Sequence, residues 1–373
     1  APEIGTGIYA KSGAMGHCNN FPGPALPHGM VQLSPDTGPY KGNFPNKAGY
    51  SMEDDSIDGF SHTHVTGTGC PGFGNFLVMP LTGEKGWDES EYRSSFNRNS
   101  EKISTGYYKV KLQDYDIDAE LTATKRAGMH RYTFTSSDSS HIIFDVTHNL
   151  ATHQPQNAKI KVVNQNTIKG SATIPKPFCW GKSPFTLYFT AKVSKPFSSF
   201  QNWKDSTLHS QKALEGTADI GAILNYSTSP NEKILLKMGI SYVNAKQAEI
   251  NLEKEIPDWN FARIRNQAQK TWNKKLNKIK VQGGTRKDKV KFYTALYHAM
   301  LGPYTASDVN GKYRGMDNKI HTVKDRTHYH FYSLWDTFRS LHPLLNLIES
   351  EQQSDMVASL LAKQDHGGWL PKW

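Results

Sequence analysis

The sequence predicts a multidomain β + α protein, with an antiparallel β-sandwich over residues 1–256 and helices beyond it. From Tyr107 to about residue 250, β-branched and aromatic residues alternate with polar ones in short runs broken by Gly, Pro, Asn and Ser. That pattern is typical of an antiparallel sandwich. Beyond Pro257 the apolar residues recur every three or four positions, which is the period of an amphipathic helix. We therefore expect a domain boundary near residue 257.

The clearest strand candidates lie in the middle of the chain. Five runs combine alternation with β-branched or aromatic side chains, at 107–112, 130–135, 141–145, 185–190 and 234–242. Residues 1–80 are rich in Gly and Pro and contain shorter apolar segments. We assign them to the same sandwich domain.

The helical part is predicted in two pieces. A linker helix over 257–284 has one apolar face, made of Phe261, Ile264, Ala268, Trp272 and Leu276. Further helices over 285–373 are separated by Gly- and Pro-containing turns. These helices have more apolar and aromatic surface than they can bury among themselves. We therefore expect the chain to be part of a longer polypeptide.

The stretch from Phe331 to Leu345 is the most informative of these helices. Its predicted apolar face is Leu334, Phe338, Leu341, Leu345 and Ile348. Ser333 is the expected N-cap, and Pro343 should kink or restart the helix because proline lacks a backbone donor.

Three side chains of this helix lie off the apolar face. Trp335, Asp336 and Arg339 are spaced so that they can share a neighbouring face. One interpretation is a sugar-binding rim, in which the indole covers an apolar sugar face and the charged groups bind hydroxyls. The other is a buried tryptophan beside a structural Asp–Arg pair.

Composition excludes several classes of protein. The 373 residues are 37% hydrophobic with a net charge of +10, but Lys and Arg are scattered, so we expect no nucleic-acid partner. No apolar run is long enough to span a membrane. The chain starts with Ala1 rather than Met, which suggests a secreted, periplasmic or cell-surface protein after removal of a signal peptide. Three cysteines allow at most one internal disulfide, and a bond between Cys18 and Cys70 stays open.

The densest polar stretch of the predicted sandwich runs from Gly59 to Cys70. His62 and His64 could bind a metal as an H-x-H pair, or could support the glycine turn Gly67-Thr-Gly-Cys70 by hydrogen bonds; no third ligand can be assigned nearby. Because glycine lacks a side chain, the backbone of this turn could approach a ligand closely. Neither a phosphate-binding GxxxxGK[ST] loop nor a GxSxG nucleophile motif occurs.

Several of these motifs resemble glycoside hydrolase family 92, the calcium-dependent exo-α-mannosidases. The resemblance rests on Phe21-Pro-Gly-Pro-Ala-Leu-Pro-His-Gly-Met-Val-Gln-Leu-Ser-Pro-Asp-Thr37, Gly59-Phe-Ser-His-Thr-His-Val-Thr-Gly-Thr-Gly-Cys70, Ser333-Leu-Trp-Asp-Thr-Phe-Arg339 and Gly368-Trp-Leu-Pro-Lys-Trp373. It implies a sandwich packed on an (α/α)6 barrel, of which 285–373 would be the first helices. It also implies inverting release of terminal α-mannose from mannose-rich glycans, with calcium as cofactor.

The resemblance places the general acid, the base and most calcium ligands beyond residue 373. No catalytic carboxylate can therefore be named, and the chain alone is expected to be inactive without the remainder of its barrel. The sugar-holding side can be carried over. Asp336 is the first candidate for bonding mannose hydroxyls, with Trp335 and Arg339 beside it. Further candidates for the pocket are Gly69, Cys70, Phe178, Trp369 and Trp373, with His62, His64 and Thr68 as structural supports.

Two rival functions remain open. A non-catalytic carbohydrate-binding protein could use the same sandwich and the same rim of Trp335, Asp336 and Arg339. A glycosidase or phosphorylase of another sandwich-plus-barrel family would also need an acid from the missing part of the barrel.

Overall fold

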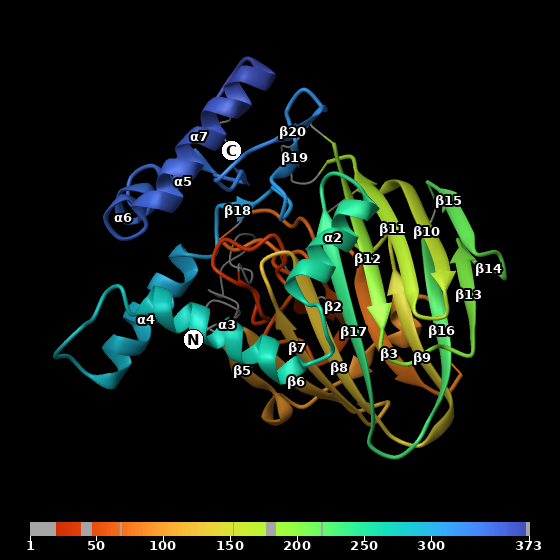
Figure 1. Ribbon diagram of the computed structural model, residues 1–373. Helices are drawn as coiled ribbons and strands as arrows, with labels where there is room; N and C mark the ends of the chain where they lie inside the picture. Colours follow the sequence, from red (N-terminus) through yellow and green to blue (C-terminus); the bar gives the residue numbers. More distant parts are fainter. Residues whose placement is uncertain are drawn as a thin grey trace.

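The computed structural model describes residues 20–38, 47–67, 69–84, 86–151, 153–176, 184–217 and 219–370. Two antiparallel sheets pack face to face, and a group of helices lies to one side of them (Figure 1). The predicted fold class, a β-sandwich followed by helices, is confirmed. Among the described residues, no helix combines the length and hydropathy that a membrane-spanning segment needs.

The first sheet contains the motif-rich N-terminal strands. Within the described residues its order is β1-β2-β3-β9-β16-β13-β14, with β4 paired to β2. The strands are β1 (Ser34–Gly38), β2 (Ser56–Ser61), β3 (Leu77–Thr82), β4 (Ser94–Ser95), β9 (Ser137–Asp145), β13 (Ser199–Lys204), β14 (Thr207–His209) and β16 (Ile220–Thr228).

The second sheet has the order β15-β10-β11-β12-β17-β8-β7-β6-β5. Its strands are β5 (Lys102–Ser104), β6 (Tyr107–Leu112), β7 (Ile117–Ala123), β8 (Ala127–Phe134), β10 (Gln156–Asn164), β11 (Thr167–Ile174), β12 (Phe185–Val193), β15 (Ala213–Gly216) and β17 (Glu232–Ser241). Two short elements, α1 (Glu89–Tyr92) and the 3-10 helix η1 (Arg98–Ser100), connect the sheets.

The core between the sheets is built from alternate residues of the strands. Phe189 of β12 packs against Phe144 of β9 and against Phe76, with ring centroids 6.4 and 4.7 Å apart. All three rings are buried. Such pairs join the two sheets because each ring removes a large apolar area from water.

Helix α2 (Ala245–Glu255) corrects the predicted extent of the β region. The alternating pattern is predicted to run to about residue 250, but β17 ends at Ser241. Asn244 caps the helix by accepting a hydrogen bond from the Gln247 amide, 2.9 Å long. The helix covers the outer side of the second sheet at β12 and β17 (Figure 1). Ala248 and Leu252 are its only fully buried apolar side chains, so its helical period is weak in the sequence.

Helices α3 (Phe261–Leu276) and α4 (Arg286–Ala299) follow α2. The predicted face of the linker helix is confirmed at four of its five positions, because Phe261, Ile264, Ala268 and Trp272 are buried. Two small hairpin-like pairs come next, β18 (Tyr304–Thr305) with β21 (Tyr329–His330), and β19 (Lys312–Arg314) with β20 (Ile320–Thr322).

The predicted helix after Phe331 is in fact two helices. These are α5 (Leu334–Thr337) and α6 (Leu341–Ile348), with α7 (Ser350–Gly367) after them. Pro343 lies in the first turn of α6, where a missing donor is harmless, so the predicted restart is confirmed. The single apolar face is wrong, since Phe338 is 59% exposed. Ser333 precedes α5 but makes no side-chain cap, and its hydroxyl donates to the Asp336 carboxylate instead.

The segment from Phe21 to Met30 lies between the sandwich and the helices. The Trp272 indole N–H of α3 donates to the Ala25 carbonyl over 2.7 Å. The His28 amide donates to the Met300 carbonyl, and the His28 carbonyl accepts from the Thr305 amide, both over 2.9 Å. This segment therefore bonds to α3 and to both ends of the turn after α4.

A second set of buried hydrogen bonds connects α2, β17 and the loop before β19. The Asp308 carboxylate accepts from the Ser241 hydroxyl over 2.9 Å and from the Asn251 amide group over 2.7 Å. Burial raises the pKa of Asp308 to about 6, although these hydrogen bonds act in the opposite direction. The folded state therefore favours the protonated carboxyl between about pH 4 and pH 6.

We predict that Asp308→Asn makes the protein more stable at neutral pH. Because the folded-state pKa is raised above the unfolded value, the contribution of Asp308 to stability is lost as pH rises through about 6. The difference in unfolding free energy between the variant and the wild type should grow by on the order of 2–3 kcal/mol from pH 4.5 to pH 7.5. Denaturant titrations at several pH values measure it. The exposed Asp138→Asn should show little change, and a difference for Asp308→Asn that is independent of pH would contradict the assignment.

Candidate functional site

The base of the loop from Gly59 to Cys70 is fixed by two buried histidines. His62 and His64 are both inaccessible to solvent. His62 Nδ1 lies 2.9 Å from the Phe76 carbonyl oxygen, and His64 Nδ1 lies 2.7 Å from the Gln32 carbonyl oxygen. Because the two imidazoles bond to different partners, the alternative of a shared H-x-H metal site finds no support here. Their role as supports of the glycine turn stays a prediction that these contacts favour.

The hydrogen bonds of His62 define its tautomer. Burial lowers the pKa of His62 to about 4, although the bond to Phe76 acts in the opposite direction, so the ring is neutral and donates from Nδ1 to Phe76. The Tyr132 hydroxyl lies 2.7 Å from His130 Nδ1 and donates to it, which leaves His130 Nε2–H to donate to His62 Nε2 over 3.1 Å. The chain Tyr132–His130–His62 thus connects β8 to the loop.

His64 belongs to a buried charged cluster around Asp36. The Asp36 carboxylate lies 2.8 Å from His64 Nε2 and 3.0 Å from His148 Nε2. Burial alone would raise the pKa of Asp36, but these two histidines hold it well below its usual value. Burial lowers the pKa of His148, but the hydrogen bonds to Asp36 and Glu89 raise it by more. The pKa therefore lies well above its usual value, and His148 is protonated. The cluster fixes β1 against the loop.

Aromatic contacts connect this loop to the segment before α5. The Thr66 amide donates to the Tyr304 hydroxyl over 3.1 Å. The Tyr304 ring stacks on Phe331, with centroids 5.4 Å apart and planes 7° apart. Phe331 also meets the edge of Phe73 at 6.0 Å. The loop of the sandwich and the start of α5, some 270 residues apart in the chain, are thereby held side by side.

These contacts close into a ring of six aromatic side chains. Each member contacts the next at a centroid distance of 4.8 to 6.3 Å, and the members are Phe73, Phe185, Tyr242, His330, Tyr304 and Phe331. They come from the loop before β3, from β12 and the residue after β17 in the second sheet, from β18, and from β21 and the residue after it. No periodic signal in the sequence brings these side chains together, because they come from segments that lie far apart in the chain.

Three residues at or near these aromatic side chains have a left-handed backbone conformation. Phe73, Phe331 and Ser333 have φ values of +63°, +60° and +43°. Residues other than glycine rarely adopt this left-handed region, and each such residue costs on the order of 1–3 kcal/mol. Two of the three flank Tyr332, directly before α5. The strained backbone turns the chain so that α5 starts beside the six aromatic side chains.

Trp335, Asp336 and Arg339 lie on the surface at and just after α5. Trp335 is 64% exposed, and Asp336 and Arg339 are also exposed. The Asp336 carboxylate accepts a hydrogen bond from Ser333, and the Arg339 guanidinium lies over the Phe338 ring at 5.9 Å. No ion pair between Asp336 and Arg339 occurs in the described part of the chain. Within this chain the interpretation as a buried tryptophan beside a structural Asp–Arg pair therefore finds no support.

Of the remaining predicted site residues, some lie in the described part of the chain and the others lie outside it. Gly69 is exposed, Cys70 is half-buried and disulfide-bonded, and Trp369 is 85% exposed just after the left-handed Gly368 that ends α7. Gly67 has a positive φ of +73°, as the predicted glycine turn requires. Thr68, Phe178 and Trp373 lie outside the described residues. The roles of all these residues in binding stay predictions.

Comparison with known proteins identifies the class of protein. Residues 2–241 match the glycosyl hydrolase family 92 N-terminal domain, and residues 247–373 match the glycosyl hydrolase family 92 catalytic domain. The chain therefore belongs to glycosyl hydrolase family 92, and the predicted resemblance is confirmed. The two matches meet between the end of β17 and the first turn of α2.

Solved structures of the family match along the whole chain. The chain is 32% identical to the family GH92 alpha-mannosidase BT3965 from Bacteroides thetaiotaomicron, with a TM-score of 0.91, covering 100% of this chain and 50% of that one. It is 25% identical to the inverting mannosidase BT2199 from the same species, with a TM-score of 0.86, covering 100% and 49%. An uncharacterized secreted glycosidase of Arthroderma benhamiae is 27% identical, covering 86% and 43%. The chain thus spans half or less of these relatives.

We predict that Tyr304→Phe loosens the loop from Gly59 to Cys70 but keeps the contacts among the six aromatic side chains. The variant keeps the stacking on Phe331 but leaves the Thr66 amide without its acceptor, a loss on the order of 1 kcal/mol. Hydrogen exchange should therefore speed up at residues 62–67 relative to the wild type. Tyr293→Phe, which removes a hydroxyl bonded to the Ile279 carbonyl elsewhere, should leave these amides unchanged. Equal protection in Tyr304→Phe and the wild type would show that the contact does not hold the loop.

Proposed function

We propose that this protein is the sandwich and first helical part of an inverting exo-α-mannosidase that acts on mannose-rich glycans. The observation that carries the proposal is the match over the entire chain to an α-mannosidase at 32% identity and a TM-score of 0.91. A second solved structure of that relative is a complex with mannoimidazole. A related mannosidase of similar fold is described as inverting. The exposed rim at α5 supplies residues suited to a sugar.

The rim can hold a pyranose by ordinary sugar-binding chemistry. The exposed Trp335 ring offers a flat apolar face, and the Asp336 carboxylate can accept hydrogen bonds from two neighbouring hydroxyls. The hydroxyl of Ser333 already bonds that carboxylate and fixes its orientation. Trp369, Gly69 and Cys70 would contribute the walls of the pocket. In this role the residues bind and orient the sugar, and none of them transfers a proton.

Inverting hydrolysis needs an acid and a base about 6.5–9.5 Å apart, which flank the bond to be cleaved and leave room for a water molecule. We propose that both carboxylates come from the remainder of the helical barrel. Large apolar side chains exposed on the helical part support this, because they form the surface that a completed barrel would cover. They are Val290, Phe338, Leu347, Val357, Leu361 and Leu370. The chain alone would then be inactive.

Calcium is proposed as cofactor, with most of its ligands outside this chain. Calcium prefers six to eight oxygen ligands. Within the described residues, the one group of three acidic, histidine or cysteine side chains with metal-binding spacing is Asp317, His321 and His366. One carboxylate and two imidazoles do not fit calcium. No step of the reaction is therefore assigned to a metal held by these residues.

Secretion to the periplasm, the cell surface or the medium is part of the proposal. A relative at 27% identity is described as a secreted glycosidase. Polymeric and protein-linked glycans are found outside the cell, where such an enzyme would meet its substrate.

Proton NMR of aryl α-mannoside hydrolysis tests the proposed reaction. The protein joined to the remainder of its barrel should release β-mannose first, and a calcium chelator should abolish the release. The 373-residue chain alone should release none. Release of α-mannose first, or release that requires phosphate, would reject the inverting mannosidase. Binding of mannose without cleavage by the completed barrel would instead favour a carbohydrate-binding protein.

Asp336→Asn should lower kcat/KM for the aryl mannoside by about 10- to 100-fold. A hydrogen bond to a charged group is worth about 1.5–3 kcal/mol, and the variant weakens two of them. The matched control is Asp365→Asn, an exposed aspartate on α7 that should keep wild-type kinetics. Wild-type kinetics for Asp336→Asn would remove Asp336 from the site.

A further inference from the structure

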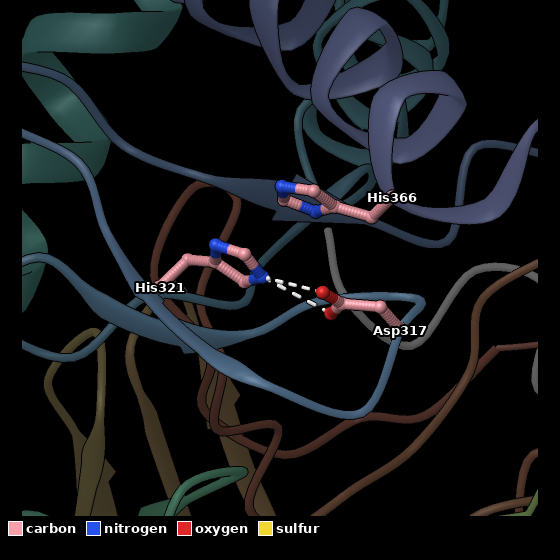
Figure 2. A group of neighbouring side chains, drawn as sticks. All are labelled: Asp317, His321 and His366. Carbon is pink, nitrogen blue, oxygen red and sulfur yellow. Dashed lines mark hydrogen bonds and ion pairs between the residues drawn. The ribbon is translucent and has the colours of Figure 1, made fainter.

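Three metal-binding side chains meet between the β19–β20 hairpin and the end of α7. Asp317 lies in the turn of the hairpin, His321 on β20 and His366 in the last turn of α7, as Figure 2 shows. Their ligand atoms lie within 4.8 Å of one another. His321 Nε2 is 3.0 and 3.1 Å from the two Asp317 carboxylate oxygens. The rings of His321 and His366 stack, with centroids 3.8 Å apart.

The surroundings hold these side chains in place. The Lys319 amide donates to Asp317 Oδ1 over 3.0 Å. The Tyr313 ring lies 5.6 Å from the His321 ring and 6.1 Å from the His366 ring. Tyr313 in turn stacks on His328 at 3.8 Å. Supports of this kind orient metal ligands, because they limit the rotation of the His321 ring and of the Asp317 carboxylate.

Two details distinguish the cluster from an ordinary ion pair. The Nδ1 atom of His366 is buried and has no hydrogen-bond partner. A Cβ atom at Gly315 would lie 2.6 Å from Asp317 Oδ1, 2.8 Å from His366 Nδ1 and 2.8 Å from His321 Cδ2. The three side chains thus converge on one point beside the Gly315 backbone. A hydrogen bond between His321 and Asp317 alone needs neither the glycine nor the third side chain.

We propose that Asp317, His321 and His366 form a site for a divalent first-row transition metal such as zinc, which ties the β19–β20 hairpin to the end of α7. Two imidazoles and one carboxylate are the donor set of such cations. Ligand atoms on one zinc ion lie at most about 4.2 Å apart, twice a bond of about 2.1 Å. Their present spread of up to 4.8 Å closes when the His366 ring turns its edge towards the other two. The metal would fix the position of Gly367, Gly368 and Trp369.

Zinc titration of the purified, chelator-treated protein tests the site. Calorimetry should show one equivalent of Zn²⁺ bound, and the thermal unfolding temperature should rise on binding. His321→Gln, His366→Gln and Asp317→Asn should each weaken the affinity at least about 10-fold. They should fold without metal and lose the thermal shift. With Co²⁺ as probe, the visible absorption of nitrogen- and oxygen-bound cobalt should appear in the wild type and disappear in His366→Gln.

His209→Gln is the matched control, since this histidine is also half-exposed and lies on β14, a strand of another hairpin. It should bind zinc as the wild type does. The proposal is overturned if the wild type binds no zinc, or if the three variants bind it with wild-type affinity. It is also overturned if binding leaves the unfolding temperature unchanged, because the metal would then not join hairpin and helix. Mannosidase activity enters none of these measurements.

Discussion

The proposed site at α5 depends on how the segment from Phe21 to Met30 is held between the sandwich and the helices. A single buried hydrogen bond, from the Trp272 indole to the Ala25 carbonyl, ties this segment to α3. Backbone bonds at His28 then tie it to the turn after α4 and to β18. A buried carbonyl without a partner would cost on the order of 1–3 kcal/mol, so the segment and the helices stay together. Because β18 includes Tyr304, the same contacts fix the aromatic partner of the loop from Gly59 to Cys70.

The six aromatic side chains at this junction combine stabilising ring contacts with strained backbone conformations. The left-handed conformations of Phe73 and Phe331 are unfavourable in themselves. Both rings contact neighbours from two directions, and Phe73 is buried, which offsets that cost. This junction is held by its own contacts and does not need the side chains that follow it in the sequence. Trp335 and Asp336 can therefore face solvent although they belong to a segment that starts among buried side chains. Binding sites are usually pre-formed on rigid supports, which is the arrangement that the proposed sugar site would need.

Much of the fold could be predicted from the sequence, but the site only in part. Periodicity revealed the sandwich, the face of α3 and the restart at Pro343, because each follows from local spacing. It missed α2, whose apolar side chains are few, and it joined α5 to α6, because Phe338 fits a helical stripe that the chain does not bury. The motif around Trp335 and Asp336 was visible in the sequence. The partnership of Tyr304 with Thr66, and that of His366 with His321, was not, since each depends on folding distant segments together.

The most direct test of this account is a crystal structure of the protein, joined to the remainder of its barrel, with mannoimidazole, the ligand of a solved relative. The account predicts that the inhibitor lies beside α5, with its hydroxyls within hydrogen-bond distance of the Asp336 carboxylate and one face of its ring against the Trp335 indole. The junction formed by Tyr304, Phe331 and Phe73 should keep the geometry described above. An inhibitor bound elsewhere, without contact to Asp336, would contradict the assignment of the sugar-holding side of the site to this chain.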